Sequence, residues 1–141
     1  KFSLKLTNSN ERIMKKHPPI IAGILLGLLF IMSAVMVLFN LVKAPPPPEG
    51  SPAAQFFGAF GPTGYLTFVK LFELVGGLLV AIPKTRNLGL LVLGPIIINI
   101  LAFHIFVTSG EGVLNPMLVI IVLLALYLLW VGRKDFAGLL N

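Results

Sequence analysis

The chain has 141 residues, of which 57% are hydrophobic and 11% are charged, against roughly 25% charged residues in an ordinary soluble domain. A domain of this size has too small an interior to hide so much apolar surface from water. The mean hydropathy of +0.97 therefore predicts an integral membrane protein. Because the chain contains no Cys, disulfides, thiolate metal sites, iron–sulfur ligation and thiol redox relays are excluded.

Four apolar runs approach or exceed the 20 or so residues that a helix needs to cross a bilayer. They cover residues 20–42, 65–83, 87–107 and 113–132, and only the second contains Lys, Arg, Asp or Glu. The runs do not alternate in polarity as barrel strands would, so they predict helices. The first run lacks an A-x-A-like cleavage site, and we expect it to be retained.

The connections between the last three runs are very short, at residues 84–86 and 108–112, so these runs are expected to be antiparallel neighbours. We predict an all-α integral membrane protein, an antiparallel four-transmembrane-helix bundle that forms a single membrane domain over residues 1–141.

The distribution of basic residues predicts the orientation of this bundle. Nine lie on one side of the membrane: Lys1, Lys5, Arg12, Lys15, Lys16, Lys84, Arg86, Arg133 and Lys134. The other side holds only Lys43, so the positive-inside rule places both termini in the cytoplasm. The same rule, with attraction to lipid head groups, accounts for the net charge of +6. We therefore expect the lipid bilayer as a partner and no nucleic acid.

The one long connection, residues 44–64, is then an outer loop. Pro45 to Pro48 predict an extended polyproline II spacer. Phe56, Phe57 and Phe60 follow, and two interpretations stay open: an anchor in the outer interface, or a lid over the bundle.

Ionisable and amide side chains inside membrane spans are costly, so each is a candidate functional residue. Lys70 and Glu73 are three residues apart, share a helix face and can form an ion pair. At about 1.5 Å per residue, Lys70 and His104 lie roughly 6–8 Å from the outer ends of their spans, and Glu73 and Asn99 roughly 12–14 Å. These four residues predict a polar pocket in the outer half of the bundle, which binds a ligand or handles protons, whereas the cytoplasmic half is aliphatic.

Each candidate also has a purely structural interpretation. The Lys70–Glu73 pair can neutralise itself and fix the helix rotation, and Lys70 can extend to the interface. Asn99 can bond between helices, and His104 can be a packing residue. Pro95 removes a backbone hydrogen bond and predicts a kink or local opening of the third span.

Several classes of site are not supported by the sequence. Bis-histidine haem ligation needs a second His in the membrane, and the other one, His17, lies at the cytoplasmic end. One His and one carboxylate do not complete a dinuclear metal site. We expect no metal, no cofactor held by this chain alone, and no catalysis by the chain alone.

Two segments resemble a known family. Phe68 to Leu79, with its Glu73-Leu74-Val75-Gly76-Gly77 element and the following Pro83 and Arg86, resembles the second helix of DoxX-like membrane proteins. Leu93 to His104, with the pattern P-x-x-x-N-x-x-x-F-H, is similar to the third helix of one DoxX-like subgroup. The resemblance covers about residues 61–131, and the proline run of the outer loop departs from the family pattern.

This resemblance implies a small four-helix protein of the prokaryotic cytoplasmic (inner) membrane, related to DoxD-type subunits of a thiosulfate:quinone oxidoreductase. It favours a multi-pass subunit of a redox or quinone-linked membrane complex, with quinone or lipid as the candidate ligand and other membrane subunits as partners. The alternatives are a non-catalytic assembly subunit and, less favoured, a small proton-coupled transporter. The sequence also leaves open whether the chain forms a homo-oligomer.

Overall fold

The computed structural model describes residues 2–140, apart from the side chains of residues 2–7, 10 and 13. Of the basic residues in the orientation argument, Lys1 lies outside the described residues, as does the side chain of Lys5. The described part is helical and contains no strand. Its α-helices are α1 (Phe2–Leu38), α2 (Pro52–Phe60), α3 (Tyr65–Ala81), α4 (Arg86–Ala102), α5 (Pro116–Val131) and α6 (Arg133–Ala137). Short 3-10 turns cover Gly61–Thr63 and Gly138–Leu140, and a π-helix covers Phe103–Val107.

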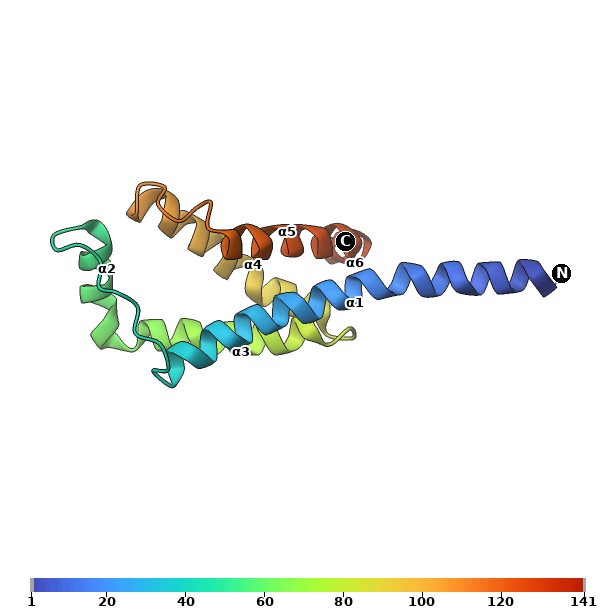
Figure 1. Cartoon of the computed structure of the whole chain (residues 1–141), viewed down its shortest axis with the longest axis horizontal. Helices are drawn as coiled ribbons and strands as arrows, with labels where there is room; N and C mark the ends of the chain where they lie inside the picture. Colours follow the sequence, from blue (N-terminus) through green and yellow to red (C-terminus); the bar gives the residue numbers. More distant parts are fainter. Residues whose placement is uncertain (1, 141) are drawn as a thin grey trace.

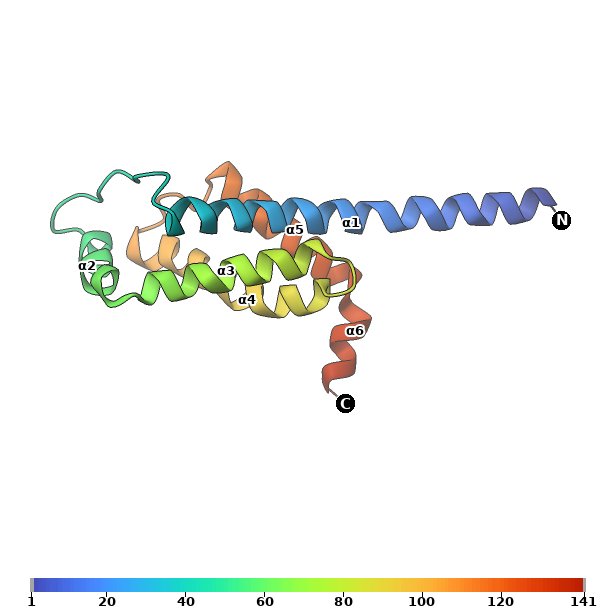
Figure 2. The same ribbon diagram turned by 90° about the horizontal axis from the view of Figure 1, so that it is seen from below.

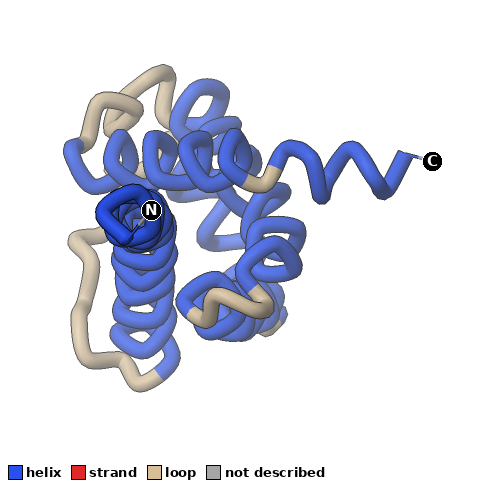
Figure 3. Tube along the Cα trace, turned by 90° about the vertical axis from the view of Figure 1, so that its right-hand side faces the viewer, coloured by secondary structure: helices blue, strands red, loops and turns tan. Residues whose placement is uncertain are grey.

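The four long helices pack around a common core. Helix α1 contacts α3 and α5, and α4 contacts the same two helices. Successive long helices run in alternating directions, and the N-terminal part of α1 extends beyond the others (Figure 1). The views in Figures 2 and 3 show α6 projecting away from this core. The core thus has two ends, one at α2 and one at α6.

Two helical segments are long and apolar enough to cross a membrane, Met14–Leu38 and Arg86–Val107. Two bent pairs raise the number to four if each pair is one span: Pro52–Thr63 with Tyr65–Ala81, at 84°, and Pro116–Val131 with Arg133–Leu140, at 67°. The chain is therefore a helical protein suited to a membrane, with two to four candidate spans.

Helix α1 begins at Phe2, well before its apolar run, but several other helix ends lie inside the apolar runs. Local backbone signals explain these inner ends. Helix α1 stops at Leu38 rather than Val42 because Asn40 takes the left-handed conformation, φ 53°, and Leu41 N donates back to Met36 O at 2.9 Å. Helix α3 begins after Gly64, φ 78°, and ends before Ile82, which is held extended by the proline that follows it.

Helix α5 likewise begins at Pro116 rather than Val113, because the Asn115 side chain caps it by accepting from Met117 N at 2.9 Å. Pro at the first helical position supplies the φ that a helix start requires.

The kink or local opening expected at Pro95 is not found there. Helix α4 stays α-helical through Pro95, and the wider turn is the π-helix at Phe103–Val107. The ring of Pro95 sits on an exposed side of the helix. The irregular turn instead contains His104, one of the four candidate residues.

Close backbone contacts at glycines hold the helices together. A Cβ added to Gly27 of α1 would lie 2.5 Å from Gly77 O and 2.8 Å from the Ala81 Cβ of α3. A Cβ added to Gly89 of α4 would collide with the backbone of Leu79 and Val80. Small residues of this kind let helix backbones approach in a membrane. The side chains packed in the core are apolar: Ala22, Leu26, Phe30, Val80, Leu90, Leu93, Ile97, Ile121, Ala125 and Leu128.

We predict that Gly89→Ala lowers the apparent melting temperature of the purified protein in detergent. The added methyl group meets backbone that cannot move aside, and overpacking of this kind costs about 1–3 kcal/mol. Gly94→Ala, in the same helix, is the matched control because nothing lies within 4 Å of its added Cβ. Its melting temperature should match the wild type or exceed it, since Ala favours a helix. Equal melting temperatures for the two variants would contradict the close approach.

Candidate functional site

Two adjoining cavities lie at the α2 end of the core. The larger, about 550 Å³, is bounded by α1, α2, α3 and α4, and the smaller, about 230 Å³, lies toward α5. Both are lined by Ser33, Lys70, Glu73, Ile100 and His104. A binding site of this kind combines apolar walls with a few converging polar groups.

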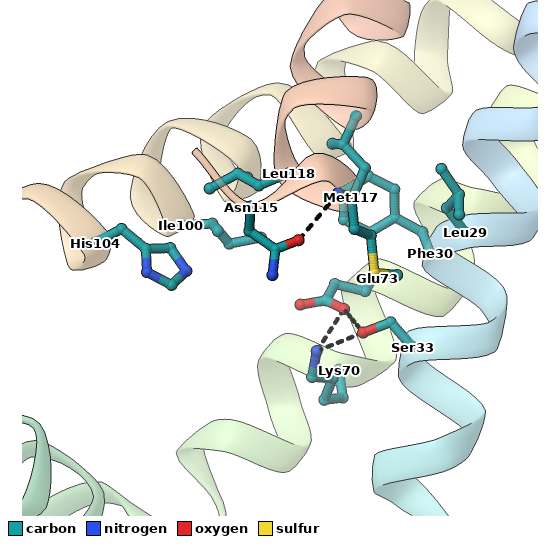
Figure 4. A pocket seen from close by; sticks show the side chains of 11 residues that line it. Leu29, Phe30, Ser33, Lys70, Glu73, Ile100, His104, Asn115, Met117 and Leu118 are labelled. Carbon is teal, nitrogen blue, oxygen red and sulfur yellow. Dashed lines mark hydrogen bonds and ion pairs between the residues drawn. The ribbon is translucent and has the colours of Figure 1, made fainter. Parts of the chain in front are cut away.

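Lys70 and Glu73 form the ion pair expected from their spacing. Lys70 Nζ lies 2.7 Å from Glu73 Oε2, within α3, and Glu73 is the buried member, 3% exposed. Ser33 of α1 joins the pair: Lys70 Nζ donates to Ser33 Oγ at 3.0 Å, and Ser33 Oγ donates to Glu73 Oε2 at 3.4 Å. Figure 4 shows the other carboxylate oxygen, Oε1, directed away from both partners. One oxygen of Glu73 is thus fixed by the protein and the other is turned to the cavity.

The loop after α4 holds the imidazole of His104. His104 Nδ1 lies 2.9 Å from Glu111 O, and the Thr108 hydroxyl lies 2.8 Å from His104 O and 2.7 Å from Glu111 O. Gly110 N donates to His104 O at 2.8 Å. Gly112, at φ 81°, leaves room for the ring, because a Cβ there would lie 2.9 Å from Nδ1. Residues 108–112 thus fix the orientation of the His104 ring through a hydrogen bond as well as through packing.

Three asparagines and a tyrosine complete the polar lining. Asn40, Asn99 and Tyr65 line the larger cavity, and Asn115 lines the smaller one. The Asn115 Oδ1 atom is used as the cap of α5, so its amide group is the part left to face the cavity, as Figure 4 shows. The close-up also shows His104 and Lys70 on opposite sides of Asn115.

Aromatic rings of helix α2 line the larger cavity. The ring centroids of Phe56 and Phe57 lie 5.1 Å and 5.6 Å from that of Phe103, and both rings line the cavity. Of the two interpretations of this phenylalanine segment, these contacts favour the lid over the bundle. The helix begins where Ser51 Oγ accepts from Ala54 N at 3.1 Å and Pro52 occupies the first turn.

The structure brings Lys70, Glu73, Asn99 and His104 to one cavity. Within the described residues, no hydrogen bond links Lys70 to His104 or Glu73 to Asn99. Residues predicted at equal depth therefore line the same cavity without bonding to each other. Sequence reasoning missed Ser33. Ser33 lies seven residues before Asn40 in an otherwise apolar run, which is the signal that marks it.

No cluster of three or more His, Asp or Glu residues that could hold a metal ion occurs in the described part of the chain. The polar groups of the two cavities are donors and acceptors for an organic ligand: an ammonium, a carboxylate, an imidazole, two hydroxyls and three amides.

Comparison with known proteins gives one similar sequence. The chain is 32% identical over 75 residues to the uncharacterized protein YwoB of Bacillus subtilis (strain 168), an alignment that covers 53% of this chain and 47% of that protein. The chain thus spans about half the length of this relative. No family model matches the chain. No solved structure matches it either.

We predict that the Lys70–Glu73 pair shows strong energetic coupling. Lys70→Met leaves the buried Glu73 carboxylate without its cation, which costs about 3–5 kcal/mol. Lys70→Met combined with Glu73→Gln removes both charges and should recover most of the lost stability. The measurement is a double-mutant cycle of thermal unfolding in detergent. Additive losses in the cycle would mean that the two side chains do not interact as the structure indicates.

Proposed function

We propose that the protein is a DoxX-like integral membrane subunit whose cavity at the α2 end binds the head group of a quinone or a related lipid-like molecule. The observation that carries this proposal is the cavity of about 550 Å³, where Lys70, Glu73, Asn99 and His104 converge within aromatic and aliphatic walls. A polar head group matches the polar lining, and an isoprenoid or acyl tail matches the exposed apolar side chains around it.

The proposed setting is an antiparallel four-span bundle of the prokaryotic cytoplasmic membrane, with both termini in the cytoplasm. The alternating directions of α1, α3, α4 and α5 support it (Figure 1), as does the basic character of the α6 end, where Lys84, Arg86, Arg133 and Lys134 lie. The cavity then opens toward the outer half of the membrane.

The proposed role is that of a redox-associated subunit. A quinone reaction needs an electron donor, and a partner chain of the complex supplies it, because electron-transfer chemistry belongs to cofactors. This chain binds and orients the head group, with Glu73 placed to exchange a proton. The buried residues toward α6, such as Leu26, Leu90 and Leu128, are apolar. That apolar half disfavours a transport path through the bundle.

The topology is tested with single cysteines in a chain that has none of its own. Gly58 of α2 and Gly138 near the C-terminus both have open space around an added Cβ, so Gly58→Cys and Gly138→Cys should fold normally. In intact cells, an impermeant thiol reagent should label Gly58→Cys alone, and Gly138→Cys should react only after permeabilisation. Labelling of Gly138→Cys in intact cells with Gly58→Cys protected would reverse the orientation.

Ligand binding is tested by filling the cavity. Ile100 lines both cavities, so Ile100→Trp should obstruct them and weaken binding of a short-chain ubiquinone at least tenfold in lipid nanodiscs. Ile98→Trp is the matched control, since Ile98 is 69% exposed on the same helix, and its affinity should equal that of the wild type. Calorimetry on the purified proteins gives both affinities.

Purification from the native membrane separates the proposal from its alternative. Quinone extracted together with redox partner chains supports the redox-associated subunit. Partner chains without any bound ligand, combined with equal affinities for the two Trp variants, would favour the assembly subunit instead.

A further inference from the structure

The hydrogen bonds that the protein makes to its own cavity side chains determine which atoms remain for a ligand. At His104, Nδ1 faces the carbonyl oxygen of Glu111 at 2.9 Å. A carbonyl oxygen only accepts, so Nδ1 carries the hydrogen. In the neutral imidazole the other nitrogen, Nε2, is then an acceptor. Figure 4 shows this second nitrogen on the side of the ring nearer Asn115 and Lys70.

Glu73 presents a second acceptor to the same space. Its Oε2 atom is engaged by Lys70 at 2.7 Å and by Ser33 at 3.4 Å, whereas no bond to Oε1 is found among the described residues. Figure 4 shows Oε1 on the side of Glu73 that faces Asn115 and His104. The shared lining of the two cavities therefore contains two acceptors without hydrogens, one on α3 and one on the π-helix.

Donors line the same cavities: Asn115 in the smaller one, Asn40, Asn99 and Tyr65 in the larger one, and Lys70 in both. Asn115 keeps its amide hydrogens because its Oδ1 is used as a cap, and Lys70 has three hydrogens, of which two are directed to Ser33 and Glu73. A hydroxyl group can satisfy both kinds of group at once, since it donates one hydrogen and accepts others. A ketone oxygen satisfies only the donors and leaves the two acceptors without a hydrogen from the ligand, which costs binding free energy.

The walls indicate the rest of the head group. Phe56, Phe57 and Phe103 line the larger cavity and contact one another with centroid separations of 5.1–5.6 Å. A flat aromatic ring of a ligand can make offset or tilted contacts with such a wall.

From these contacts we infer that the cavity selects a hydroxyl-bearing aromatic head group, a quinol in preference to the corresponding quinone. This inference rests on the proposed function and adds the oxidation state of the ligand to it. His104 Nε2 and Glu73 Oε1 accept from the ring hydroxyls, and Thr108, Glu111 and Gly112 act as positioning residues that hold the acceptor nitrogen in place.

The test compares two probes that differ only in those hydroxyls. The full chain in lipid nanodiscs, under anaerobic conditions, is titrated with a ubiquinol and with the matching ubiquinone, each carrying one isoprene unit. We expect the quinol to bind at least tenfold more tightly. A site built to bond a hydroxyl discriminates strongly against the analogue that lacks it. Equal affinities, or tighter binding of the quinone, would overturn the inference while leaving the proposed function in place.

Variants of His104 test whether its Nε2 atom causes the preference for the quinol over the quinone. His104→Leu should weaken the quinol and leave the quinone affinity unchanged, which lowers their ratio to what Glu73 Oε1 alone supports. His104→Gln retains a side-chain acceptor of similar reach and should keep part of the ratio. Ile105→Leu, a change at an exposed neighbour in the same π-helix, should leave it intact. A ratio that is undiminished in His104→Leu would contradict the assigned role of Nε2.

Two further results distinguish this inference from the wider proposal. Failure of both probes to bind, in the wild type and in Ile100→Trp alike, would overturn the quinone-binding function itself. Diacylglycerol, which bears a hydroxyl but no aromatic ring, should compete poorly with the quinol. Effective competition by diacylglycerol would overturn the aromatic part of the inference.

Discussion

The close approach of α1 to α3 is the contact on which the rest of the site depends. Gly27 lies against the backbone of Gly77, at a separation that leaves no room for a side chain on Gly27 and little on Gly77. Six residues beyond Gly27, and four before Gly77, the same two helices present Ser33 and Glu73 to each other. Without the glycine contact the hydroxyl of α1 would not reach the carboxylate of α3, and Glu73 would keep a single partner. Backbone packing thus determines how many hydrogen bonds the buried charge receives.

The polarity of the core is divided between its two ends. Glu73 is the one charged residue among the buried side chains of the described chain, and it lies toward α2, whereas the buried residues toward α6 are aliphatic. Charges cost most in the middle of a membrane, and Glu73 is the middle residue of α3, so its hydrogen bonds with Lys70 and Ser33 offset part of that cost. The consequence is that the polar cavities lie at one end of the protein, near α2.

Much of the fold followed from hydropathy, because runs of apolar residues must form helices in a bilayer. The third span, predicted at 87–107, matches the helical segment Arg86–Val107 closely. Periodicity also identified Lys70 and Glu73 as a pair. Helix ends were less predictable, because Asn40 and Asn115 act through backbone conformation and capping, which hydropathy does not measure. The contact between the His104 ring and the Glu111 carbonyl could not be predicted from the sequence, because it depends on how residues 108–112 fold back onto the ring.

Helices α3 and α5, which carry part of the site, are much shorter than the neighbouring helix α1. Helix α3 has 17 residues and α5 has 16, whereas α1 has 37. At 1.5 Å per residue, α3 and α5 measure roughly 25 Å, less than the roughly 30 Å of an average hydrocarbon core. A bilayer that surrounds such short walls thins locally to match them. Thinning draws the head-group region of the bilayer toward the buried ion pair and brings lipid head groups closer to the cavity.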